Sequence, residues 1–233
     1  TLSSINVTSP AAGTYKAGQV VTIVATYSEN IYGNASKAAV TSSTAPVLKI
    51  KFGSSTERTA TFSSVSGKTI TYTYTIASGD NGKLATTSYS GTVYDQVGNK
   101  LTVGNKTIGG NAITADTTAP TCTITASKSS PTNASSITYT FTFSENVTGF
   151  TIDDVTVTNG TKGTFTATSE KVYTLVVTNS GSCSQKVEVA ASKCTDAVGN
   201  NNTAASKSIT IDRTAATLSS INVTSPAAGT YKA

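Results

Sequence analysis

The residues of this sequence that could carry chemistry are carboxylates and thiols. The 233-residue chain has 12 Asp and Glu and three Cys, but no His, Met or Trp. Without histidine there is no imidazole base to activate a serine or cysteine nucleophile, and no imidazole ligand for zinc, copper or non-haem iron. No pair of carboxylates is singled out as the acid and base of a glycosidase cleft. The sequence therefore predicts a protein that is not an enzyme.

Six of the carboxylates belong to three short motifs that each occur twice, in the same order. They are Glu29 and Glu145 in S-E-N, Asp95 and Asp196 in D-x-V-G-N, and Asp116 and Asp212 in D-x-T-A. D-x-V-G-N is typical of a tight turn in which the Asp and Asn side chains bind local backbone and the Gly supplies a positive φ. A second interpretation is a calcium site, since calcium takes about 6 to 8 oxygen ligands from carboxylates, carbonyls and water. Both interpretations stay open on the motifs alone.

The composition is that of a folded, threonine-rich chain. Thr and Ser fill 77 of the 233 positions (46 and 31), yet the hydrophobic content of 37% is too high and too regularly spaced for a disordered stalk. The net charge of +5 comes from lysines scattered singly, which predicts no nucleic-acid partner. No apolar run is long enough for a membrane span, and no signal peptide begins the chain, so we expect a mature or excised segment.

Internal repeats are the most specific signal in the sequence. Residues 217–233 are identical to residues 1–17, which predicts a repeating unit of 216 residues and the start of a second copy. Within the unit the three paired motifs predict two homologous domains, 1–118 with a loop insertion and 119–216. Residues 217–233 are then the first strand of the next repeat.

Alternation of hydrophobic residues with threonine predicts the elements that must position these motifs. In the segment 68–76, Ile70, Tyr72, Tyr74 and Ile76 alternate with threonines, as a strand that is packed on one face and solvated on the other requires. Seven such runs are expected in each domain. Those of the first are 3–8, 18–27, 46–53, 57–63, 68–76, 84–94 and 107–115. Those of the second are 121–126, 136–143, 151–158, 162–168, 171–177, 185–192 and 205–212. Seven short strands in about 100 residues indicate an all-β Greek-key sandwich.

These residues carry a family resemblance. The stretch 129–161, the segment VEVAASKCTDAVGNNNTA and the closing ITID resemble the bacterial immunoglobulin-like repeats that occur in tandem in large surface proteins and adhesins. The resemblance covers residues 121–216, while the first domain shares S-E-N, D-Q-V-G-N and DTTAP. It implies two tandem immunoglobulin-like sandwiches, display on the cell surface and a stalk or adhesive role without catalysis.

In such a sandwich the end of the second strand, the loop after the sixth strand and the incoming linker lie at one pole. Asp116, Glu145 and Asp196 are then expected to converge between the domains as an interdomain calcium site. The resemblance supports calcium, because related giant adhesins are stiffened by this ion at domain junctions. The remaining three motif residues, Glu29, Asp95 and Asp212, would form the equivalent junctions with adjacent repeats.

The three cysteines all lie in the second domain. Cys122 starts its first strand and Cys194 ends its sixth, at one pole, which favours a Cys122–Cys194 disulfide. Cys183 would then be left over, either as a thiol or as a link to another chain. The alternative is that all three are reduced.

The function that the sequence predicts is structural: a repeat unit of a long extracellular surface or filament-forming protein. Its partners would be adjacent repeats, other copies in a filament, or a host or surface ligand. The alternative is a ligand-binding adhesin module that grips a glycan or a protein through loops at one pole. An exposed aromatic pair there, such as Tyr32 with Tyr94, would favour glycan binding.

Overall fold

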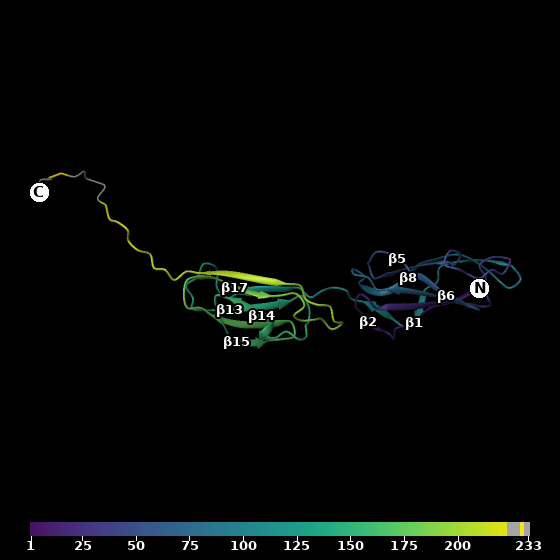
Figure 1. Cartoon of the computed structure of the whole chain (residues 1–233), viewed down its shortest axis with the longest axis horizontal. Helices are drawn as coiled ribbons and strands as arrows, with labels where there is room; N and C mark the ends of the chain where they lie inside the picture. Colours follow the sequence, from purple (N-terminus) through teal and green to yellow (C-terminus); the bar gives the residue numbers. More distant parts are fainter. Residues whose placement is uncertain (223–228, 231–233) are drawn as a thin grey trace. The chain divides into compact units, whose positions relative to one another are not determined.

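A computed structural model of the chain describes residues 1–222 and 229–230. The chain divides into two compact units (Figure 1). Unit 1 contains Thr1–Thr121, Ser144–Phe150 and Ala191–Thr203, and unit 2 contains Cys122–Phe143, Thr151–Ala190 and Ala204–Ala233. The domain limits 1–118 and 119–216 stay predictions, since unit 1 also includes two segments from the second half of the chain.

Unit 1 is built from two sheets. Its strands are β1 (Leu2–Ser9), β2 (Gly13–Tyr15), β3 (Val20–Tyr27), β4 (Val47–Phe52), β5 (Arg58–Thr59), β6 (Thr61–Ser66), β7 (Thr69–Thr75), β8 (Gly82–Tyr94), β9 (Lys100–Val103), β10 (Ile108–Gly110) and β11 (Ile113–Ala115). One sheet has the order β10-β1-β3-β7-β6, and the other has the order β2-β11-β8-β4-β5 with β9 paired to β8. The pairs β1–β10 and β2–β11 are parallel, whereas the remaining pairs of unit 1 are antiparallel.

Period-2 alternation produces the core of unit 1. In β3, Ile23 and Tyr27 are buried, and Ile70 and Tyr72 of β7 point to the same interior. Phe52 of β4, in the opposite sheet, belongs to the same hydrophobic cluster. Burying a large apolar side chain of this kind contributes about 1.5–3 kcal/mol, so the two sheets are held together mainly by these inward faces.

Unit 2 has the strand order of an immunoglobulin constant-type sandwich. Its strands are β12 (Cys122–Ala126), β13 (Ser136–Phe143), β14 (Val155–Thr158), β15 (Thr161–Ala167), β16 (Val172–Thr178), β17 (Cys183–Val189) and β18 (Ala205–Ile211). One sheet runs β12-β13-β16-β15 and the other β14-β17-β18. Labelled A to G in chain order, these are the sheets ABED and CFG, which define that fold. The prediction of an all-β immunoglobulin-like fold is confirmed.

All seven strands expected in the second domain are present, each within two or three residues of its predicted limits except the third. There a short 3₁₀ helix, η1 (Ile152–Asp154), occupies the start of the predicted run. In unit 1 the predicted run 57–63 divides into β5 and β6, which belong to different sheets, and the last predicted run divides into β10 and β11. Two strands that the sequence did not suggest, β2 and β9, are added.

The described part of the tail forms no strand. Residues 217–222 are exposed and have no regular structure. Residues 223–228 and 231–233, which the prediction of a first strand of the next repeat also covers, lie outside the described residues. Among the residues that the structure describes, no helix has the length and apolar character needed to cross a membrane.

Candidate metal-binding site

The D-x-V-G-N turn in the second half of the chain is closed by the side chain of Asp196. Its Oδ1 accepts hydrogen bonds from the backbone N–H groups of Val198 (2.9 Å) and Asn200 (2.8 Å), and its Oδ2 accepts one from Asn200 Nδ2 (2.7 Å). Gly199 has a φ of 89°, in the left-handed region where an L side chain is strained. Asp196 is only 4% exposed, so these bonds also satisfy a buried carboxylate. The interpretation of the motif as a tight turn is confirmed here.

The first D-x-V-G-N motif forms the same turn. Asp95 Oδ1 accepts hydrogen bonds from the N–H groups of Val97 (2.9 Å) and Asn99 (2.8 Å), and Oδ2 accepts one from Asn99 Nδ2 (2.7 Å). Burial acts to raise the pKa of Asp95, but the hydrogen bonds, those from Asn99 first, outweigh it and leave the pKa below its ordinary value. Gly98 also has a φ of 89°. The two copies therefore share one geometry down to individual hydrogen bonds.

A two-residue bridge joins each turn to its S-E-N loop. Thr148 and Thr195 exchange backbone hydrogen bonds of 2.8 and 3.1 Å, and Tyr32 and Tyr94 do the same at 2.8 and 2.9 Å. The bridge explains why a glutamate and an aspartate that are distant in sequence lie side by side in each copy.

Three carboxylates meet within unit 1. One oxygen from each of Asp116, Glu145 and Asp196 lies within 4.8 Å of the other two. Asp196 is buried, while Asp116 and Glu145 are half-buried. The structure thus brings together the three residues that the sequence placed at one pole.

Hydrogen bonds of both the backbone N–H and the backbone carbonyl hold Asp116 in position. Its N–H donates to Tyr15 O (2.9 Å), which continues the pairing of β11 with β2. Its carbonyl oxygen accepts a hydrogen bond from Asn200 Nδ2 (2.9 Å), and its Oδ1 accepts one from Thr118 N–H (3.1 Å). Asn200 therefore holds two acidic residues at once, the carboxylate of Asp196 and the main chain of Asp116.

The donor set fits calcium, a hard cation that prefers carboxylate oxygens. Asp196 accepts three hydrogen bonds, and a carboxylate has about four lone-pair sites, so it retains capacity for a cation. The carbonyl of Gly199 is already taken by Lys16 Nζ at 3.0 Å. Lys16 thereby places one positive charge beside the turn, which would offset part of the negative charge of the three carboxylates.

The other three motif residues are divided between the units. Glu29 and Asp95 line a cavity of about 180 Å³ in unit 1, together with Thr1. Asp212 is an exposed residue of unit 2, and its Oδ1 accepts a hydrogen bond from Thr214 N–H (2.9 Å). The equivalent junctions with adjacent repeats stay a prediction.

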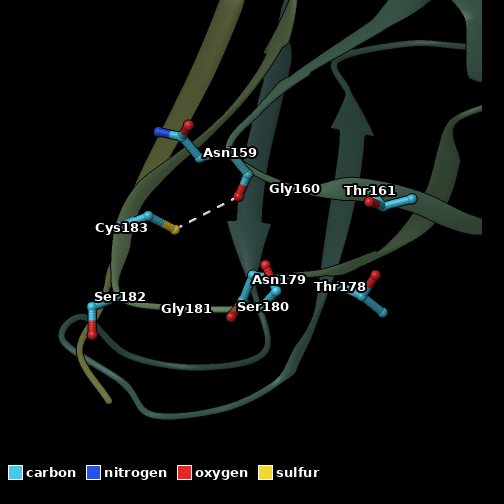
Figure 2. Close-up of a pocket in the computed structure, with 9 residues that line it drawn as sticks. All are labelled: Asn159, Gly160, Thr161, Thr178, Asn179, Ser180, Gly181, Ser182 and Cys183. Atoms are coloured by element: carbon cyan, nitrogen blue, oxygen red, sulfur yellow. Dashed lines mark hydrogen bonds between the residues drawn. The ribbon is translucent and has the colours of Figure 1, made fainter. Parts of the chain in front are cut away.

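The cysteines occupy different environments. Cys122 is half-buried at the start of β12, and Cys194 is buried in the segment after β17. The Cys122–Cys194 disulfide stays a prediction. Cys183 lines a cavity of about 470 Å³ at the β14–β15 and β16–β17 turns of unit 2, and its thiol donates to Asn159 O at 3.6 Å (Figure 2). No sequence pattern predicts this cavity, because its other lining residues are Gly, Asn, Ser and Thr of turns and strand ends.

Sequence reasoning missed two residues that position the acidic cluster. Asn200 ends the D-x-V-G-N motif, so a signal was present, but its second bond to Asp116 spans 84 residues. Lys16 is 183 residues from Gly199 and lies in no motif that could have identified it.

Comparison with known proteins gives a family match over part of the chain. Residues 116–213 match a family described as bacterial Ig-like domain. No curated protein matches the sequence.

Solved structures that resemble the chain include the Escherichia coli adhesin FdeC and a tandem fragment of titin. FdeC is 16% identical, over 91% of this chain and 65% of its own, with a TM-score of 0.39. The titin fragment is 13% identical, over 90% of this chain and 66% of its own, with a TM-score of 0.35. The chain thus spans just under two thirds of either structure, and these likenesses carry no argument about function. The ABED/CFG strand order of unit 2 agrees with this match of residues 116–213 to the bacterial Ig-like domain family.

Proposed function

We propose that the chain is a structural repeat unit of a long extracellular surface or filament-forming protein, in which it acts as a stalk or spacer. The observation that carries the proposal is the identity of residues 217–233 with residues 1–17, next to a bacterial Ig-like domain. A sandwich that is repeated without change extends a protein, because each copy adds length but no new chemistry.

The distribution of aromatic side chains supports a spacer over a glycan-binding module. Every Tyr and Phe within residues 1–222 is buried or half-buried. Tyr32 and Tyr94 are held in their backbone bridge and are half-buried. A sugar ring stacks on an exposed aromatic face, and within residues 1–222 no Tyr or Phe is largely exposed.

Location is tested on intact cells of the source organism. We expect antibodies raised against the folded chain to label intact cells, and an external protease to remove that label while cytoplasmic markers stay intact. Labelling that requires lysed cells would contradict a surface role.

We propose further that Asp116, Glu145 and Asp196 bind calcium. When bound, the ion would neutralise the mutual repulsion of the three carboxylates. The turn would hold Asp196 in place and Asn200 would hold the backbone of Asp116, so binding would tie the segment 116–121 to the D-x-V-G-N turn. A ligand that binds only the folded state raises its stability with the logarithm of ligand concentration.

The calcium proposal is tested by thermal unfolding with added calcium and with excess chelator. We expect calcium to raise the Tm of the chain, and Asp116→Asn together with Glu145→Gln to abolish that increase. Asp153→Asn is the matched control, since Asp153 is exposed and lies outside the cluster. An equal Tm with calcium and with chelator would exclude the site, whatever the outcome of the cell-surface experiment.

A further inference from the structure

The segment after β11 is held in unit 1 by contacts at both of its ends. At its beginning, the carbonyl of Asp116 accepts a hydrogen bond from Asn200 Nδ2 (2.9 Å). At its end, Thr121 N–H donates to Ser144 Oγ (3.0 Å), and Ser144 N–H donates back to Thr121 O (2.8 Å). We call this segment, residues 116–121, the docked linker; its first residue belongs to the acidic cluster.

The residues at the beginning of unit 1 form the same contacts as the end of the docked linker. Thr1 N donates to Ser28 Oγ, and Ser28 N–H donates to Thr1 O (2.8 Å), as Thr121 and Ser144 do. Thr1 therefore stands where Thr121 stands in the docked linker. The Asp95 turn repeats the Asp196 turn bond for bond, but Asn99 Nδ2 has Asp95 Oδ2 as its acceptor and no second acceptor among the residues that the structure describes.

The space that Asp116 fills in one copy is a cavity in the other. The cavity of about 180 Å³ is lined by Thr1, Glu29, Asp95 and Asn99. Glu29 and Asp95 are the counterparts of Glu145 and Asp196, the two residues whose carboxylates lie within 4.8 Å of Asp116. By this correspondence, a residue five places before Thr1 in a continuous chain would meet the cavity, as Asp116, five places before Thr121, meets Glu145 and Asp196.

The sequence supplies a segment of the right kind. Thr217 is the copy of Thr1, and the residues directly before it, 212–216, align with 116–120. Their local conformation also agrees, because Thr214 N–H donates to Asp212 Oδ1 (2.9 Å) as Thr118 N–H donates to Asp116 Oδ1 (3.1 Å).

From these matches we propose that residues 212–216 of one repeat bind in the cavity of the following repeat, with the carbonyl of Asp212 accepting the second hydrogen bond of Asn99 Nδ2. The occupant of the cavity is a second copy of this chain, joined end to end. The inference rests on the proposed role as a repeat unit, and it describes how consecutive repeats would be joined. All joints along the array would then be built on one plan, with Asp116 or Asp212 facing an S-E-N glutamate and a D-x-V-G-N aspartate.

The first test adds residues 205–216 directly before Thr1 of the full chain. By NMR we expect the side-chain amide signals of Asn99 to move toward those of Asn200 and to show contacts with the added copy of Asp212. A chain that carries the same added residues in reversed order should keep the Asn99 signals of the original chain. Unchanged Asn200 signals show that each variant is folded. Identical Asn99 signals in all three chains would overturn the proposal.

The second test uses two copies of the repeat joined without extra residues, in which Arg213 occurs twice. Residues 214–216 after the first Arg213 lead into a complete repeat, whereas those after the second lead only into residues 217–233. Trypsin cleaves after arginine in locally open segments, so we expect cleavage at the first site to be slower by on the order of tenfold. Equal rates at the two sites would contradict a docked linker while leaving a surface location, which is tested on cells, untouched.

Discussion

Asp80 is a carboxylate that unit 1 buries completely. It accepts hydrogen bonds from Arg58 Nε (3.0 Å), the Tyr74 hydroxyl (2.6 Å) and Ala77 N–H (2.9 Å), and so it links β5, β7 and the turn after β7. The Tyr74 hydroxyl and Ala77 N–H are neutral, part-buried donors. Removing the carboxylate that accepts their hydrogen bonds would leave them unsatisfied.

The first prediction concerns this network. Asp80→Asn turns one acceptor oxygen into a donor that faces other donors, and we expect it to lower the free energy of unfolding by about 2 kcal/mol. The side chain of Arg58 is 32% exposed, so water compensates part of its lost partner and a larger penalty is not expected. Urea unfolding measures the change.

The matched control is the exposed ion pair of Lys49 with Glu57, whose side chains are 44% and 43% exposed. Lys49→Gln should leave the unfolding curve almost unchanged, because solvated pairs contribute little. Equal effects of the two substitutions would show that Asp80 is not a structural centre of unit 1.

Three buried tyrosines predict the behaviour of the chain in alkali. The hydroxyls of Tyr27 and Tyr89 are 2.7 Å apart, and those of Tyr72 and Tyr89 are 3.2 Å apart. Burial raises the pKa of Tyr27 to about 12, against the opposing effect of its hydrogen bond to Tyr89, and burial also raises the pKa values of Tyr72 and Tyr89.

The second prediction is that the free energy of unfolding decreases above about pH 10. An unfolded tyrosine ionises near pH 10, whereas Tyr27 in the fold keeps its proton to about pH 12. Above pH 10 the unfolded state therefore binds fewer protons than the folded state, so stability falls as pH rises, by up to about 3 kcal/mol for Tyr27. Urea unfolding between pH 8 and about pH 11 measures this slope. The slope should be smaller in Tyr27→Phe, and an unchanged slope would contradict the assignment.

At the scale of elements, the strands that could be predicted are those with clear alternation. β13 and β16 have a buried residue at every second position, and the sequence displays that pattern directly. β2 and β9 could not be predicted, because strands of three and four residues are too short to display an alternation of their own and form only where a neighbouring strand supplies their hydrogen bonds. η1 was missed because Asp154 accepts hydrogen bonds from the N–H and hydroxyl of Thr151 and so favours a local turn over the start of a strand.

The candidate site likewise has residues that could be predicted from the sequence and contacts that could not. Its three carboxylates could be predicted, since each lies at the end of a strand or in a turn whose place in the sandwich follows from strand order. The contacts of Asn200 and Lys16 could not, because they depend on which loops approach each other in space.

The third prediction concerns the tail. Residues 217–222 are exposed and form no strand, so deletion of 217–233 removes no buried surface from this described part. We expect the truncated chain to unfold at the same urea concentration as the full chain. A marked loss of stability would place the end of the repeat unit beyond residue 216.

The chain as a whole consists of two unlike compact units. Unit 1 has two sheets that share one large hydrophobic cluster, and unit 2 is a smaller seven-stranded sandwich. The positive net charge of +5 comes mainly from lysines that are scattered singly along the sequence.

The parallel pairs of unit 1 have a mechanical consequence. β1 pairs with β10 and β2 with β11, so the first and last strands of the unit lie in the same direction. Tension applied to both ends of the chain would slide these strands past each other and load all hydrogen bonds of a pair together. In the described part of unit 2, the parallel pairing of this kind is a single bridge between Thr132 and Ile211.

Under a pulling force we therefore expect unit 2 to unfold before unit 1, at a lower force in single-molecule experiments, because forced unfolding is governed by the unfolding rate. The reverse order would show that these strand pairs do not resist the load. A fibre of such repeats would then lengthen in steps when stretched. Unit 2 would unfold first, and the extension that it releases would lower the force on unit 1.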